Sequence, residues 1–127
     1  MKREAGLWID HRKAVVVTLT DEGEETQVIE SGMEKHVRFA SGSDELGSAE
    51  DMRDRQFASH LDRYYDRVIE SIGEAGSLLI LGPGEAKGEL VKRLQGAKLG
   101  ERVVGVETMD KMTERQIAAR VRERFAS

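Results

Sequence analysis

The stretch LLILGPGEAKGELVKRL, from Leu78 to Leu94, decides most of the fold. It opens with an apolar run of strand length, turns at Gly82-Pro83-Gly84, and continues as a charged segment whose apolar residues recur at helical spacing. A wholly apolar strand is typical of a strand covered on both faces of a sheet. The stretch therefore predicts a buried strand, a sharp turn and an amphipathic helix.

Three further strands are expected before this stretch. EAGLWID and KAVVVTLT are rich in strand-forming residues and are separated by the short turn DHR, Asp10 to Arg12. A second turn, DEGE at 21–24, leads into TQVIES. Strands joined by turns this short must run antiparallel, so the first part of the chain predicts an antiparallel meander.

The remaining elements follow from changes of pattern. Residues 40–54 are rich in Gly, Ser and acidic residues and predict a mobile loop. From about Asp51 to Gly73 a helical stripe takes over, and the run ERVVGVET at 101–108 predicts a short strand of the buried type. Thr113 followed by Gln116 predicts the capping box of a last helix. The stripe of the long helix comprises Phe57, Leu61, Tyr64 or Tyr65, Val68 and Ile72.

The predicted order is thus β-β-β-α-β-α-β-α, as a single α/β domain over residues 1–127 with a mixed sheet flanked by helices. An antiparallel meander followed by two βα units is the arrangement of ribonuclease H-like folds. The second half of the sheet is then expected to be parallel.

Composition limits the function. The 127 residues include no cysteine, which excludes disulfides, thiolate zinc sites and cysteine nucleophiles. No apolar run approaches the roughly 20 residues that span a bilayer, and the start does not resemble a secretory signal. We therefore expect a cytoplasmic protein without a membrane partner or cofactor. The net charge of −4 argues against a freestanding nucleic-acid binder, although local basic faces are compatible with it.

Several stretches resemble the central domain of archaeal and eukaryotic peptide-chain release factors and of Pelota-like ribosome rescue proteins. The likeness runs through DMRDRQFASHLDRYYDRVIESI, GSLLILGPGEAKGELVKRL and VVGVETMDKMTERQIAARVRERF. The opening LWIDHRKAVVV resembles the first hairpin of small stand-alone bacterial relatives described as release-factor-like or translational machinery proteins. LGPGEAKGEL is the most specific of these elements.

One departure from that family is decisive. Release factors carry Gly-Gly-Gln in the loop before the long helix, whereas this chain has SGSDELGSAEDMRD there, from Ser41 to Asp54. The resemblance therefore implies a non-catalytic, translation-associated interaction module near the ribosome or tRNA. Its expected contacts are four basic residues of the long helix: Arg53, Arg55, Arg63 and Arg67. Acidic residues alternate with these arginines, so a solvated helix with pairs four residues apart is the alternative.

Two other functions remain open. Asp10, Glu70 and Asp110 are the available counterparts of the acids that hold divalent metals in ribonuclease H-like nucleases, although Asp10 in a strand-end turn also suits a structural role. A small-ligand-binding or homo-oligomeric scaffold would place its site at Gly82, Gly84 and Glu85, where a helix begins. Glu85 and Pro83 oppose an anion site there, and the three histidines, His11, His36 and His60, lack metal-ligand spacing.

Overall fold

An antiparallel meander forms the first half of the sheet. Its strands are β1 (Glu4–Ile9), β2 (Lys13–Thr20) and β3 (Gly23–Glu30), with β2 paired antiparallel to both others. Gly23 has a φ of +135°, a conformation that glycine adopts without strain at the start of β3. The computed structural model describes residues 3–32, 49–73 and 75–126, except for the side chains of residues 49–58.

The second half of the chain adds two parallel strands and covers the sheet with helices. Its elements are α2 (Ala49–Ile72), β4 (Ser77–Gly82), α3 (Ala86–Gly96), the short 3-10 helix η1 (Gly100–Arg102), β5 (Val103–Thr108) and α4 (Glu114–Phe125). β4 pairs parallel with both β1 and β5, so the strand order is β3-β2-β1-β4-β5. This confirms the predicted mixed α/β sheet and its order of elements.

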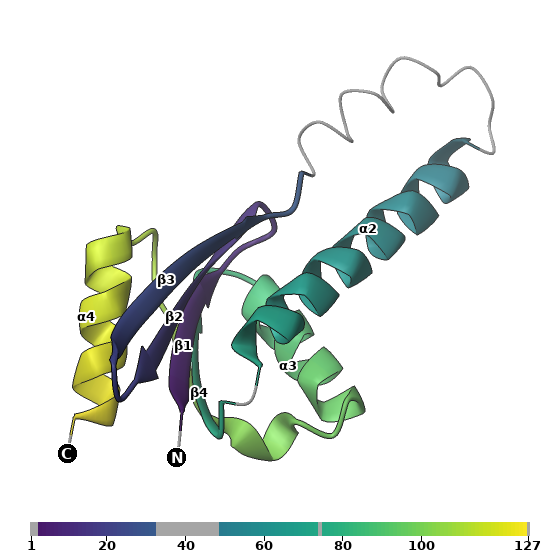
Figure 1. Cartoon of the computed structure of the whole chain (residues 1–127). Helices are drawn as coiled ribbons and strands as arrows, with labels where there is room; N and C mark the ends of the chain where they lie inside the picture. Colours follow the sequence, from purple (N-terminus) through teal and green to yellow (C-terminus); the bar gives the residue numbers. More distant parts are fainter. Residues whose placement is uncertain (1–2, 33–48, 74, 127) are drawn as a thin grey trace.

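Helices α2 and α3 cover one face of the sheet and α4 covers the other (Figure 1). An apolar core lies on each face. Under α2 and α3, the core contains Leu7, Val16 and Ile80 from the strands together with Tyr64 and Leu90. Under α4, Trp8 and Leu81 pack with Ile117 and Val121. A Cβ at Gly6 would lie 2.3 Å from a Val121 methyl carbon, so only glycine there lets α4 approach the sheet this closely.

Three local predictions were tested directly. The capping box is present, because Thr113 Oγ1 accepts from Gln116 N at 3.2 Å and Gln116 Oε1 accepts from Thr113 N at 2.9 Å. The long helix was expected from about Asp51, and α2 begins at Ala49, so its first residues fall in the predicted loop at 40–54, of which 40–48 lie outside the described residues. β5 is not a buried strand: it is an edge strand whose residues alternate between half-buried and exposed. Among the described residues, no helix is long and apolar enough to cross a membrane.

Candidate functional site

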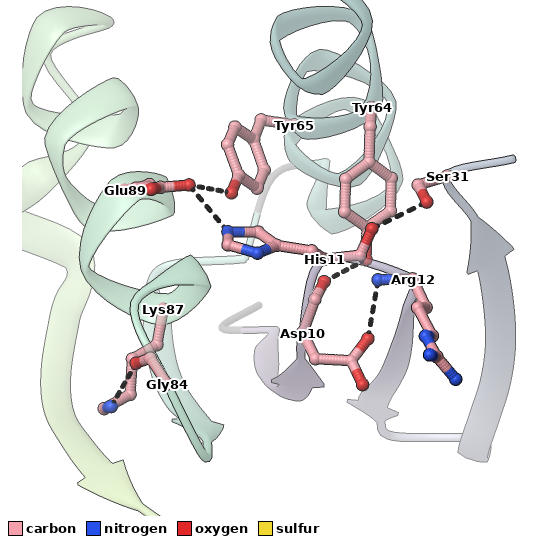
Figure 2. Close-up of polar contacts among 9 residues, drawn as sticks. All are labelled: Asp10, His11, Arg12, Ser31, Tyr64, Tyr65, Gly84, Lys87 and Glu89. Atoms are coloured by element: carbon pink, nitrogen blue, oxygen red, sulfur yellow. Dashed lines mark hydrogen bonds and ion pairs between the residues drawn. The ribbon is translucent and has the colours of Figure 1, made fainter. Parts of the chain in front are cut away.

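The carboxyl ends of the parallel strands β1 and β4 meet beside the turn that joins β1 to β2. Asp10 shapes this turn, because its Oδ1 accepts from the backbone N–H groups of Arg12 and Lys13, each at 2.8 Å. The Asp10 N–H in turn donates to Lys13 O at 3.0 Å. Figure 2 shows this carboxylate folded back onto its own turn. Asp10 therefore has a structural task that does not depend on any ligand.

Two adjacent tyrosines of α2 reach the same end of the sheet from above (Figure 2). Tyr64 is fully buried and its hydroxyl donates to Asp10 O at 3.0 Å. Tyr65 donates to Glu89 Oε1 of α3, and Glu89 Oε1 lies 3.1 Å from His11 Nε2. Burial, and for Tyr65 also the bond to Glu89, raises the pKa of both phenols well above the usual value. These contacts tie α2, α3 and the β1–β2 turn together.

No sequence pattern predicted this cluster. One of the two tyrosines was expected in the core stripe and no metal site was expected at His11, whereas both tyrosines are buried and His11 contacts Glu89. His11 and Glu89 are 78 positions apart, and no local pattern connects them. The His11 and Glu89 side chains are each 40% exposed, so the cluster reaches solvent on one side. Its hydrogen bonds hold α2, α3 and the β1–β2 turn in place relative to one another.

The Gly82-Pro83-Gly84 turn follows β4 directly and is explained by packing. A Cβ at Gly82 would lie 2.3 Å from Ile9 O, so glycine is required where β4 passes β1. Gly84 O accepts a bond of 2.6 Å from Lys87 Nζ. Glu85 is the exposed N-cap residue of α3 and its side chain makes no capping bond. A carboxylate at this position opposes the binding of an anion at the helix N-terminus.

The acids of the nuclease alternative do not form a common metal site. Asp10 is bound within its own turn, while Asp110 lies beyond β5, where its backbone carbonyl accepts from Trp8 Nε1 at 3.1 Å. Glu70 lines a hollow between α2 and β3. Within the part of the chain that the structure describes, no three His, Cys, Asp or Glu side chains gather closely enough to hold a metal ion.

The basic residues of α2 divide into two pairs. Arg53 and Arg55 belong to the first half of the helix, and their side chains lie outside the described residues. Arg63 is exposed, and Arg67 donates to Glu30 O of β3 at 3.1 Å. Both line a hollow of about 590 Å³ at the end of β3. The hollow is completed by Glu30, Ser31, Gly32, His60 and Asp66.

The acids beside these arginines are paired with a residue of another helix. Arg93 of α3 contacts Asp62 Oδ1 at 3.2 Å and Asp66 Oδ1 at 2.5 Å. The hydrogen bond that Arg93 donates to the Asp66 carboxylate raises the pKa of Arg93. Asp62 and Asp66 are therefore directed toward α3 rather than toward the arginines of their own helix. Among the described residues, Arg63 has no acidic partner.

Comparison with known proteins finds similarity only in three dimensions. No protein-family model matches the sequence, and no curated protein matches it. The structure is similar to Pelota from Archaeoglobus fulgidus, with a TM-score of 0.59 and 14% identity over 97% of this chain. It is also similar to Pelota from Thermoplasma acidophilum, with a TM-score of 0.54 and 19% identity over 98% of this chain. For an archaeal translation termination factor, the TM-score is 0.50 and the identity 13% over 93% of this chain.

The likeness is one of fold. It agrees with the fold expected from the release-factor and Pelota resemblance, since it covers nearly the whole chain at low identity. The chain spans about a third of each of these proteins, namely 31%, 33% and 37% of their lengths.

Proposed function

We propose that this protein is a non-catalytic, translation-associated module that contacts the ribosome or tRNA through the polar face of α2. The fold shared with Pelota and with a translation termination factor supports the class of process. The absence of Gly-Gly-Gln anywhere in the sequence argues against hydrolysis of peptidyl-tRNA. The contact residues of this proposal are Arg53, Arg55, Arg63 and Arg67.

We choose the polar face of α2 because Asp62 and Asp66 pair with Arg93 of α3. Asp66 lies three residues from Arg63 on α2, a spacing at which the two side chains could pair along the helix. Here Arg93 binds both acids from α3, so their charge is compensated without using the arginines of α2. Arg63 is then available to a phosphate, and the N-terminal half of α2 extends beyond the sheet (Figure 1).

Co-sedimentation with purified ribosomes over a salt series tests this proposal. The double variant Arg63→Glu/Arg67→Glu is expected to lose pelleting, and wild-type pelleting is expected to weaken as salt rises, because phosphate contacts release counterions. The variant with all four arginines changed to Glu extends the test to Arg53 and Arg55.

A matched control comes from α4. Arg115 is exposed and Arg124 donates to the strand carbonyl Val104 O at 3.3 Å, as Arg67 does to Glu30 O. Arg115→Glu/Arg124→Glu therefore changes charge equally on another face and should pellet like the wild type. Equal loss in both double variants would show that net charge alone matters, and absence of wild-type pelleting at low salt would refute the proposal.

A further inference from the structure

The two edges of the sheet differ in how they are protected from pairing with another chain. The β3 edge is strongly acidic, with five acids between residues 21 and 30. β5 carries a single acid, Glu107, which is bound to Arg120 Nε of α4 at 3.0 Å. Charged side chains are a common protection of edge strands against association. The β5 edge lacks this protection.

One hydrogen bond shows which backbone N–H and C=O groups of β5 point away from β4 and could pair with another strand. Met109 N donates to Gly82 O of β4 at 2.9 Å, so the backbone of Met109 faces into the sheet. Because N–H and C=O groups alternate in direction along a strand, Val104, Val106 and Thr108 present theirs outward. Arg124 uses one lone pair of Val104 O, and a carbonyl oxygen accepts two bonds.

Exposed apolar side chains accompany these groups. Val104 is 41% exposed and Val106 is 46% exposed. Val106 lies opposite Ile80 of β4, a residue of the core beneath α2 and α3. It therefore extends that apolar face to the edge of the sheet, where its side chain remains half in water.

We propose that β5 pairs antiparallel with β5 of a second copy of this chain, about a twofold axis at Val106. This register pairs outward-facing residues with each other: Val106 meets its own counterpart and Val104 meets Thr108 of the other copy. Gly105 then faces Glu107 of the second copy, which leaves room for the bond between that carboxylate and Arg120.

Charges at the two ends of β5 are complementary in the same arrangement. Glu101 and Arg102 precede the strand, and Asp110 and Lys111 follow it. Antiparallel pairing brings the end of β5 beside Glu101 and Arg102, which lie in η1, near the end of the second copy's β5 beside Asp110 and Lys111, twice by symmetry. This self-complementary pattern favours a second copy over an unrelated extended peptide. The inference is independent of the proposed ribosome contact.

Sedimentation equilibrium over a wide concentration range tests the dimer. The wild type is expected to show a reversible monomer–dimer equilibrium. Val106→Glu sets two carboxylates opposite each other and should weaken dimerisation about tenfold or more. Val28→Glu is the matched control, because Val28 is 45% exposed on the opposite edge strand, and it should leave the equilibrium unchanged. Thermal melting checks that both variants are folded.

Engineered cysteines test the register, since the chain contains no native thiol. Val106→Cys should form a disulfide-linked dimer under mild oxidation, because opposed Cα atoms in such a pair lie about 5.5 Å apart. Val104→Cys faces Thr108 and should remain unlinked. A wild type that stays monomeric at every concentration would overturn the proposal. Loss of the dimer in Val28→Glu but not in Val106→Glu, or equal linking of both cysteine variants, would do the same.

Discussion

Replacing Gly82 by alanine should destabilise the protein through a backbone clash. The added Cβ would lie 2.3 Å from Ile9 O, and neither group can move away, because both belong to paired strands in the centre of the sheet. Overpacking of this kind typically lowers the free energy of unfolding by about 1–3 kcal/mol. Because the clash is with a backbone oxygen, we expect a loss in the upper part of this range, about 2–3 kcal/mol. For a domain of this size the melting temperature should fall by roughly 8–12 °C.

Gly84→Ala is the control two residues further along the turn. A Cβ there meets nothing within 4 Å and the backbone is not in the positive-φ region, so its stability should equal or exceed that of the wild type by up to about 1 kcal/mol. Calorimetry or thermal circular dichroism measures both variants. If the two alanines melt at the same temperature, packing does not explain Gly82, and a ligand-binding role for the turn would regain weight.

Three further predictions concern the tyrosine cluster, a helix cap and the ion pairs of α3. Because the folded-state pKa of Tyr64 and Tyr65 is raised, stability is fully present below about pH 10 and declines above it; tyrosinate absorbance should therefore rise together with loss of circular dichroism, not before it. Thr113→Ala removes the cap of α4 and should cost about 1 kcal/mol in chemical denaturation, whereas an unchanged midpoint would contradict the role of the cap. Arg93→Ala should change stability by less than about 1 kcal/mol. It should nevertheless reduce ribosome pelleting, because Asp62 and Asp66 beside Arg63 lose their partner. Unchanged pelleting would refute the idea that Arg93 compensates the charge of these two acids.

The fold was largely predictable because its signals are local. Short turns force neighbouring strands to run antiparallel, and the change from alternating to helical spacing marks where the meander ends. The cap at Thr113 was equally local, since both of its hydrogen bonds join residues three positions apart. These features depend on backbone geometry and on side-chain periodicity within a few residues.

The prediction for β5 failed because a short apolar run does not reveal which neighbours will cover it. Val103 to Val106 would suit a central strand, but the sheet order leaves β5 with one partner strand. The number of strand neighbours is a property of the assembled sheet. For the same reason, the exposed edge on which the dimer proposal rests could not be inferred before the fold was known.

The sequence by itself determined the order of strands and helices, the apolar faces and the absence of Gly-Gly-Gln. Only the tertiary structure decided which charged groups compensate one another. Asp66 could pair with Arg63 along α2 or with Arg93 across to α3, and the packing of the two helices brings Arg93 within 3.2 Å of both Asp62 and Asp66. His11, Tyr65 and Glu89 likewise meet through three separate elements. Electrostatic partners depend on distance in space, and that distance is set by packing rather than by separation along the chain.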